Sequence, residues 1–246
     1  MIVNAIAGNY VLNMRARKPA SSSDGVRDAD TESPVGVADV LTRLRERIAS
    51  QAIPPGSWLR EWDVANEFKV TRPLAREALD RLALLGFVDR QPNRGVVVHR
   101  FEREEILQLY EIREVNEGLC ARLAVRHAQS ESWDDLIALF GTTMERAVER
   151  NDFDAYSTYY EQFRTRLIHA AACPRLAELL ERFNDMTRTA GRRMLLVSDR
   201  TRHALLEHRA LLTALRAGDE DTAERLRRTT IRNVRDAVQR YHAYLL

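Results

Sequence analysis

The sequence predicts a mainly α-helical protein with one small β-hairpin and, after it, an antiparallel bundle of six or seven helices. Three observations lead to this fold class. Apolar residues recur every three or four positions over most of the chain, as they do on the buried face of a helix. Two short runs rich in β-branched residues flank Pro92-Asn93, and no such run follows the hairpin. We therefore expect a tail at 1–35, a first domain at 36–100 and an all-helical domain at 101–246.

The N-terminal segment has the composition of a disordered tail. Ser, Asp, Arg, Pro and Gly dominate residues 15–36, and the apolar residues there show no periodicity. The stretch from Met1 to Met14 is mildly apolar, but asparagines interrupt it and no charged segment precedes it, so it does not resemble a secretory signal. We expect residues 1–35 to be disordered, with Met14 as a second candidate for the start of translation.

Residues 36–100 predict four elements in a fixed order. A first helix begins near Val37, where apolar residues share one face, and the prolines of IPPGSWL end it. Two further helices are expected at 61–68 and 71–86. Pro73 suits the first turn of the second of these helices, and Gly86 suits its end. Because the hairpin follows directly, this order predicts a winged helix-turn-helix domain.

From residue 102 onward the sequence indicates helices only. Each expected helix has an apolar stripe at helical spacing, and short connections separate one helix from the next. Short connections join antiparallel neighbours, which predicts a bundle. The six expected helices span residues 102–128, 131–150, 152–172, 174–195, 199–217 and 219–244.

Composition and charge limit the classes of function. Hydrophobic residues make up 45% of the 246 residues, and charged residues make up 30%, with a net charge of +2. The positive excess is local, because residues 34–100 carry 11 basic and 8 acidic residues whereas residues 101–246 carry 23 and 24. A nucleic-acid-binding head on a nearly neutral body has this distribution of charge.

The sequence lacks the patterns of a membrane-spanning segment and of a disulfide or cysteine metal site. No apolar run approaches the roughly 20 residues that span a bilayer. The only two cysteines, Cys120 and Cys173, fall in helical apolar patterns, which suits neither a disulfide framework nor a CxxC metal site. We expect a cytoplasmic protein that does not contact a membrane.

The second helix of the helix-turn-helix carries the side chains that reading DNA requires. A helix reads a duplex from the major groove, where arginine donates two hydrogen bonds to guanine and threonine contacts phosphate or base. Thr71, Arg72 and Arg76 lie at the start of this helix, on the side away from its leucines. Arg94 at the hairpin tip could reach a neighbouring groove or phosphate, and Arg43 on the first helix could contact the backbone. The alternative is that these arginines only solvate helix surfaces.

The same stretch resembles the GntR family of bacterial regulators. The shared motifs are PG-x-x-L, VTRPLAREAL, RL-x-x-x-G and P-x-RG-x-x-V, all in register. The helical remainder is similar to the FadR-type (FCD-type) effector domain through IREVNEGLCARLAVRHA, LIHAAACPRLAELL and EHRALLTALRAGDEDTAERL. The resemblance covers roughly residues 38–244. It implies a homodimer that binds an inverted-repeat operator in double-stranded DNA.

The resemblance also assigns positions on the DNA-binding domain. It implies operator contacts at the start of the recognition helix, where Thr71, Arg72 and Arg76 match, and a wing where Arg94 and Gly95 match. One position departs from the family pattern. Trp62 stands on the preceding helix where a DNA-contacting arginine is common, which removes one expected contact but not the mode of binding.

A metal centre is the next feature that the resemblance raises. Many FadR-type domains hold a divalent metal with one aspartate and three histidines, and the metal binds a carboxylate effector. Aligned on LIHAAACPRL, the four ligand positions fall on Tyr160, Arg164, His208 and Thr230. Three of the four ligands are absent, and the other histidines have no partner at ligand spacing. We therefore expect no metal and no other cofactor.

The periodicity places these four positions, and one arginine of the first bundle helix, on inward-facing stripes. A guanidinium that faces a bundle core costs free energy unless an anion pairs with it. Either internal carboxylates such as Glu117 supply the anion, or an effector does. In the second case we expect Arg164 to replace the charge of the metal within a ring of polar side chains. The expected ring consists of Arg113, Tyr160, Arg164, His208 and Thr230.

Three classes of function compete. An enzyme is disfavoured because the sequence has no glycine-rich phosphate loop, nucleophile elbow, metal set or paired-carboxylate motif. The sequence favours a transcription regulator, with repression as the expected mode, whose operator binding responds to a small organic acid or an acyl-CoA-like effector. The alternative is a DNA-binding regulator whose bundle binds no ligand and serves only for dimerisation.

Overall fold

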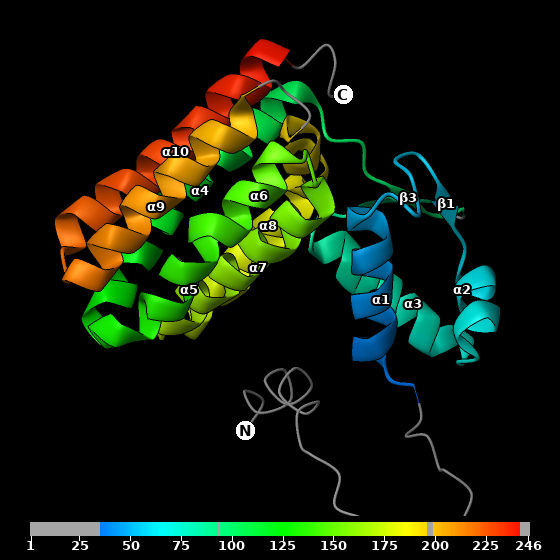
Figure 1. Cartoon of the computed structure of the whole chain (residues 1–246). Helices are drawn as coiled ribbons and strands as arrows, with labels where there is room; N and C mark the ends of the chain where they lie inside the picture. The colour runs from blue at the N-terminus through cyan, green and yellow to red at the C-terminus, as the bar shows by residue number, and fades with distance from the viewer. Residues whose placement is uncertain (1–34, 93, 196–198, 242–246) are drawn as a thin grey trace, which may run out of the picture. The chain divides into compact units, whose positions relative to one another are not determined.

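The computed structural model describes residues 35–92, 94–195 and 199–241. The expected tail at 1–35, with Met14, lies outside the described residues except for Val35, and its disorder stays a prediction. The expected fold class is confirmed. Within the described residues the chain is mainly helical, with a small sheet in its N-terminal third and helices alone after it (Figure 1).

The first three helices begin and end at the residues that cap them. The Asp39 carboxylate accepts a hydrogen bond from the amide of Gly36 at 2.8 Å, at the start of the first helix. Thr71 is the N-cap residue of the third helix, and Pro73 lies in its first turn. Gly86 follows that helix with a φ of 79°, a left-handed conformation that glycine adopts without strain. The helices are α1 (Val37–Ala49), α2 (Glu61–Phe68) and α3 (Arg72–Leu84).

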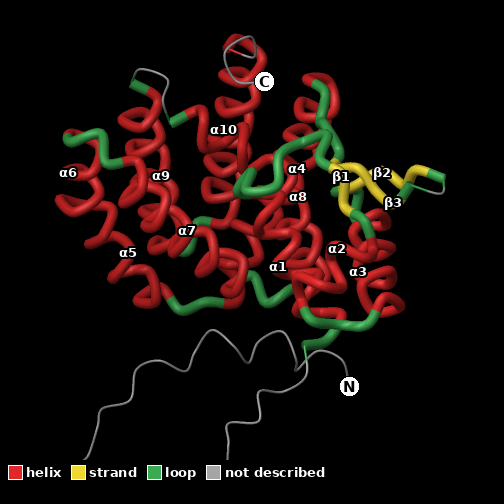
Figure 2. The backbone as a smooth tube through the Cα atoms, turned by 90° about the vertical axis from the view of Figure 1, so that its right-hand side faces the viewer, coloured by secondary structure: helices red, strands yellow, loops and turns green. Residues whose placement is uncertain are grey.

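A three-stranded antiparallel sheet completes this domain, and the sequence predicted only two of its strands. β2 (Val88–Gln91) and β3 (Gly95–Val98) form the expected hairpin, whereas β1 (Trp58–Leu59) pairs with the other edge of β3. A strand of two residues is too short to show alternation of apolar and polar side chains, so the sequence pattern does not reveal β1. Figure 2 shows the three strands gathered beside α2 and α3.

One hydrophobic core joins the three helices to the sheet. Six of its side chains, from α1, α3 and β3, are at most 1% exposed. Replacing one of these side chains with alanine typically costs about 2–5 kcal/mol of unfolding free energy. The core therefore holds α3 and the hairpin in a fixed relation. These six side chains are those of Val40, Leu44, Leu79, Leu82, Val96 and Val98.

The second part of the chain is a helical bundle whose helix bounds follow the expected spans, with one exception. A single helix was predicted over residues 131–150, but the segment is broken into four short elements. The break falls at Gly141, whose ψ of −127° is not helical. Apolar spacing is helical on both sides of such a kink, so the periodicity did not predict it. The elements are α4 (Arg103–His127), η1 (Ser130–Trp133), α5 (Asp134–Ala138), η2 (Leu139–Thr143), α6 (Met144–Glu149), α7 (Phe153–Ala170), α8 (Pro174–Met194), α9 (Arg200–Ala217) and α10 (Glu220–Tyr241).

Helix α4 packs against α7, α8, α9 and α10, so it connects most of the bundle. Its longest contact is with α10, and Figure 1 shows the two helices running alongside each other. The two helices lie close together at Gly118, where an added Cβ atom would lie 2.5 Å from the Arg228 side chain. A larger residue at position 118 would therefore push α10 or its arginine away from α4.

Two smaller observations concern the membrane and the cysteines. Among the described residues, no helix combines the length and the apolar character that crossing a bilayer requires. Cys120 and Cys173 are both free thiols. Burial raises the pKa of the Cys120 thiol to about 12, so this thiol stays protonated and unreactive.

Candidate nucleic-acid interface and bundle cavity

The amino-terminal turn of α3 presents hydrogen-bond donors and no carboxylate. The side chain of Thr71 makes no capping hydrogen bond, so its hydroxyl stays available to another acceptor. Arg72 is exposed and forms no salt bridge within the described part of the chain. Because the first turn holds no acidic residue, the positive end of the helix dipole is not neutralised. The turn is therefore a surface that attracts anions, as a DNA-contacting helix requires.

Arg76, one turn further along α3, has a partner that the sequence did not predict. Its guanidinium donates two hydrogen bonds to the Glu61 carboxylate on α2, at 2.7 and 2.8 Å. The same hydrogen bonds hold the pKa of Glu61 below its usual value. Arg76 must therefore exchange a carboxylate for a phosphate or a base before it contacts DNA. Its pairing with Glu61 orients the side chain in the absence of DNA.

The hairpin places one exposed arginine beside a glycine with a special conformation. Arg94 is exposed in the turn between β2 and β3. Gly95 has a φ of +102°, and a Cβ atom there would lie 2.8 Å from the carbonyl oxygen of Leu59. The close approach of β1, together with the positive φ, explains why glycine begins β3.

Arg43 on α1, a predicted DNA contact, and Trp62 on α2, which departs from the family pattern, are both exposed. The exposed Arg43 guanidinium lies 5.9 Å from the ring centre of Phe68, in a cation–π contact. Trp62 on α2 is 59% exposed. All the predicted DNA-contacting side chains are exposed, and Gly95 is partly buried; their contact with DNA stays a prediction. The exposed side chains are those of Arg43, Thr71, Arg72, Arg76 and Arg94.

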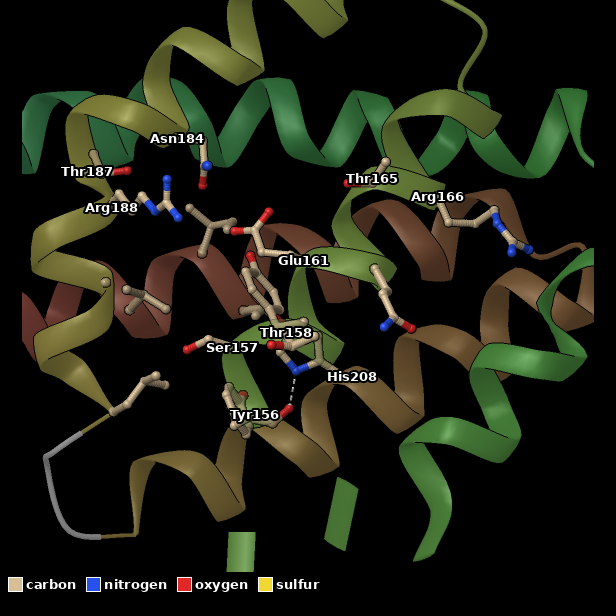
Figure 3. Close-up of a pocket in the computed structure, with 18 of the residues that line it drawn as sticks. Tyr156, Ser157, Thr158, Glu161, Thr165, Arg166, Asn184, Thr187, Arg188 and His208 are labelled. Atoms are coloured by element: carbon tan, nitrogen blue, oxygen red, sulfur yellow. Dashed lines mark hydrogen bonds between the residues drawn. The ribbon is translucent and has the colours of Figure 1, made fainter. Parts of the chain in front are cut away.

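In the bundle, a cavity of about 1070 Å³ lies between side chains of α4, α7, α8, α9 and α10. This volume lies slightly above the roughly 300–1,000 Å³ that small-molecule sites occupy. The close-up shows Asn184, Thr187 and Arg188 extending from α8, with Ser157 and Glu161 on α7 (Figure 3). The lining therefore combines aromatic and aliphatic side chains with amide, hydroxyl and charged groups.

Four of the five residues predicted for effector binding line this cavity. They come from four helices, so only the folded bundle brings them together. The fifth predicted residue, Arg164, does not line it. The lining residues among the five are Arg113, Tyr160, His208 and Thr230.

The structure corrects the expected position of Arg164. Its guanidinium donates hydrogen bonds to Glu161 at 2.8 Å and to Glu181 at 3.1 and 3.2 Å, and its side chain is only 9% exposed. Two carboxylates thus occupy the donors that an effector would need. Arg164 is buried as expected, but it lies about 100° further round the helix than Phe163, where its guanidinium contacts Glu181 of α8 and not the cavity. Its role in effector binding stays a prediction.

The sequence reasoning missed Arg227, which occupies the position of a buried positive charge. It is 0% exposed, and one of its nitrogens, Nη2, donates to Glu117 and to the Tyr160 hydroxyl oxygen, the latter at 3.3 Å. Its Nε and Nη1 atoms have no hydrogen-bond partner in the described part of the chain. One signal could have identified it: Arg227 is four residues after Ala223 and three before Thr230, on the stripe already taken as inward-facing.

Arg113 and Arg227 share one carboxylate. Arg113 donates to Glu117 at 2.6 and 2.9 Å and to the Thr187 hydroxyl, while Arg227 contacts the other oxygen of Glu117. Burial alone would raise the pKa of Glu117, but the two guanidiniums outweigh it and lower this pKa to about 2. Glu117 is therefore ionised, and it serves as the internal carboxylate that the sequence analysis named as one alternative for Arg113.

His208 is a neutral imidazole in an aromatic shell. Burial, together with the nearby charge of Arg227, lowers its pKa to about 3. Its Nδ1 contacts the carbonyl oxygen of Ala204, which only accepts, so Nδ1 carries the proton and Nε2 holds a lone pair. No partner for Nε2 occurs in the described part of the chain. The ring centre of Phe140 lies 5.6 Å from that of His208, and the ring centres of Tyr160 and Phe163 each lie 5.3 Å from it.

The side chains at the four aligned metal positions do not fit a divalent metal. The Tyr160 oxygen accepts a hydrogen bond from Arg227, and Thr230 donates to the carbonyl oxygen of Leu226 at 3.2 Å. Only His208 is an ordinary metal ligand, and within the described ranges no three histidine, cysteine, aspartate or glutamate side chains come together. A buried guanidinium beside this position would further repel a cation.

Comparison with protein families gives two matches. Residues 37–98 match the family described as bacterial regulatory proteins, gntR family. Residues 108–233, about half of the chain, match the FCD domain.

Individual relatives are distant but extend over most of the chain. The chain is 25% identical over 179 residues to a probable D-xylose utilization operon transcriptional repressor from Paenarthrobacter nicotinovorans, covering 72% of this chain and 77% of the relative. It is 26% identical over 199 residues to the HTH-type transcriptional repressor RspR from Escherichia coli (strain K12), covering 80% and 86%.

Solved structures share the fold. The E. coli McbR/YncC structure superimposes with a TM-score of 0.67 at 21% identity, covering 83% of this chain and 98% of the other. A putative GntR regulator from Rhodococcus sp. RHA1 gives a TM-score of 0.61 at 24% identity, covering 82% and 97%. The chain therefore belongs to the GntR family of bacterial regulatory proteins and, with an FCD domain after its helix-turn-helix domain, is a transcription regulator and not an enzyme.

Proposed function

We propose that this regulator is a cytoplasmic, FadR-type homodimer that represses genes by binding an inverted-repeat operator. We further propose that a small organic anion in the bundle cavity changes its affinity for that operator. The exposed, carboxylate-free first turn of α3 is the observation that carries the DNA-binding part. Two relatives that cover most of the chain are named repressors, which favours repression over activation.

In the proposed complex the first turn of α3 enters the major groove. Arg72 donates two hydrogen bonds to a guanine, and the Thr71 hydroxyl contacts a phosphate or a base. Arg76 leaves Glu61 for the same groove, since a base edge or a phosphate offers acceptors equal to the carboxylate it gives up. Arg94 on the wing contacts the neighbouring backbone, as does Arg43 on α1.

Alanine substitutions on one helix test this arrangement. Arg72→Ala should weaken operator binding by about 1–3 kcal/mol, or roughly 5- to 150-fold, and relax base preference at one position. Arg81→Ala is the matched control, because Arg81 is also an exposed α3 arginine but lies in the last turn and pairs with Glu77. Fluorescence anisotropy with a labelled operator duplex measures both. Equal losses in the two variants, or none in Arg72→Ala, would contradict the placement of α3 in the groove.

The charge balance of the bundle supports an anionic effector. The buried guanidiniums of Arg113, which lines the cavity, and of Arg227 face the single carboxylate of Glu117. His208 is neutral, which leaves one excess positive charge among these four groups. Arg227 donates to the oxygen of Tyr160, so the hydroxyl proton of Tyr160 is free to be donated into the cavity. An uncompensated buried cation stabilises an anion placed near it. The proposed effector is a carboxylate or an acyl thioester with phosphate groups.

Thermal shifts with defined probes test the effector site. We expect at least one of benzoate, citrate and acetyl-CoA to raise the melting temperature, because a ligand that binds the folded state stabilises it. Benzamide, which has the shape of benzoate without its charge, should raise it less. Tyr160→Phe should reduce the shift, whereas the neighbouring Tyr159→Phe, which does not line the cavity, should preserve it. The reverse order of the two variants would contradict the role given to Tyr160.

A second candidate function has support of its own. Internal carboxylates already pair with Arg113 and Arg164, which is what a bundle that binds no ligand and only dimerises would require. In that case no anion shifts the melting temperature or the operator affinity, while Arg72→Ala still weakens DNA binding. The two assays together therefore separate a sensor from a scaffold.

A further inference from the structure

A tryptophan in the first turn of α2 lies largely in water. Trp62 is 59% exposed, whereas Trp133, in the bundle, is completely buried. Tryptophan is strongly buried on average and is enriched where proteins contact a partner, because its ring offers a large and rigid surface. An indole left this exposed is therefore a candidate contact, and its position on the helix indicates which partner it meets.

Trp62 lies on the flank of α2 that is turned away from α1. Successive helix residues are about 100° apart, which puts Trp62 and Glu67 on opposite flanks of the buried face of α2. Glu67 pairs with Arg47 of α1, so the flank of Glu67 is the one beside α1. Directly before Trp62, Glu61 accepts two hydrogen bonds from Arg76 of α3 at 2.7 and 2.8 Å. The first turn of α2 therefore lies beside an arginine for which we propose a groove contact.

The other side chains of this turn limit what Trp62 can contact. Glu61 and Asp63 are both acidic, and a carboxylate repels a phosphate, so the turn does not suit the DNA backbone. The base edges of the major groove carry no net charge, and the apolar group that they expose is the C5-methyl group of thymine. Packing an indole ring against this methyl group removes apolar surface of both from water, which is favourable.

We propose that Trp62 is a specificity-determining residue of operator binding, whose indole ring packs against the C5-methyl group of one thymine in the half-site that Arg72 reads. Trp62 thereby selects thymine at a position that the predicted arginine contacts do not specify, since arginine selects guanine. The inference rests on the proposed placement of α3 in the major groove, and it adds α2 to the surface that reads the bases.

Replacement of thymine by uracil tests the contact at the level of one methyl group. The operator is the duplex that the parent enriches from a random pool, and its thymines are replaced one at a time. At one position the parent should lose roughly fourfold in affinity, the value of one buried methyl group. Trp62→Ala should bind the unmodified operator more weakly and lose nothing further on that replacement. Trp58→Ala is the matched control, because Trp58 is a 46% exposed tryptophan on β1 of the same domain, and it should respond as the parent does.

The outcomes separate this inference from the proposed function. A parent that responds to no uracil replacement, or a Trp62→Ala variant that responds as the parent does, would overturn the role of Trp62 alone. Loss of the response in Trp58→Ala as well would overturn its assignment to Trp62. Failure to enrich any duplex, or parent-like binding by Arg72→Ala, would overturn the placement of α3 and this inference with it.

Tryptophan fluorescence provides a readout that does not depend on affinity. The chain has three tryptophans, so in Trp58→Phe the emitting indoles are Trp62 and the buried Trp133, which acrylamide barely reaches. Saturation with the operator should remove most of the acrylamide quenching in this variant, because the ring of Trp62 is then covered by DNA. In Trp62→Phe the quenching of Trp58 should persist. Unchanged quenching in Trp58→Phe, or an equal fall in both variants, would overturn the contact.

Discussion

The buried imidazole of His208 makes a quantitative prediction about acid stability. In the folded chain its pKa is lowered from 6.5 to about 3. Because the folded value lies below the unfolded one, the unfolded state takes up the proton first, and stability falls as the pH drops below 6.5. The loss is about 1.4 kcal/mol per pH unit in this range, so from pH 7 to pH 5 it amounts to about 2 kcal/mol.

Denaturant unfolding followed by circular dichroism at pH 7 and pH 5 measures this loss. His208→Gln keeps a polar side chain but does not titrate, so between these pH values it should lose about 2 kcal/mol less unfolding free energy than the parent. Glu117 does not interfere, since its stabilising effect is present above 4.5 and disappears only as the pH falls towards its folded value of about 2. Equal losses in the parent and in His208→Gln would refute the neutral, buried state of this histidine.

Three further predictions concern the wing, the recognition helix and the corrected arginine. Gly95→Val should lower the melting temperature and weaken operator binding, because it adds a Cβ atom 2.8 Å from the Leu59 oxygen at a positive φ; a variant that melts like the parent would contradict this. Glu61→Gln should tighten operator binding by roughly fivefold, because it releases Arg76 and removes a negative charge near DNA; unchanged or weaker binding in anisotropy would refute it. Arg164→Met should cost about 1–2 kcal/mol of unfolding free energy, since its two glutamate partners would lose their counter-charge, and it should preserve the response to anions. Intact stability with a lost response would instead assign Arg164 to the effector site.

The winged helix-turn-helix domain could be predicted in detail because the sequence signals for its elements are local. Pro73 and Gly86 mark the limits of α3 within a few residues of the bounds observed. The reason for a glycine at position 95 could not be predicted, because it depends on the close approach of β1, and a strand of two residues has no sequence pattern of its own. The apolar periodicity did not predict the kink at Gly141, because the spacing on either side of it is helical.

The charged interior of the bundle could be predicted only in part. Periodicity identified Arg113 as inward-facing, and the structure places it there. Periodicity also puts Arg227 on the inward-facing stripe of Ala223 and Thr230, but it does not identify its partner, Glu117, which lies 110 residues away in the sequence. Pairing over such a distance is a property of helix packing, and a single sequence contains no direct signal for it.

Selection of DNA sequences from a random duplex pool tests the central claim most directly. The parent protein should enrich an inverted repeat, and anisotropy should show that it binds this duplex at least about a thousandfold more tightly than a scrambled one. A half-site that tolerates new bases after Arg72→Ala would assign that contact to α3. Failure to enrich any sequence, or equal affinity for selected and scrambled duplexes, would contradict the conclusion that this chain reads an operator.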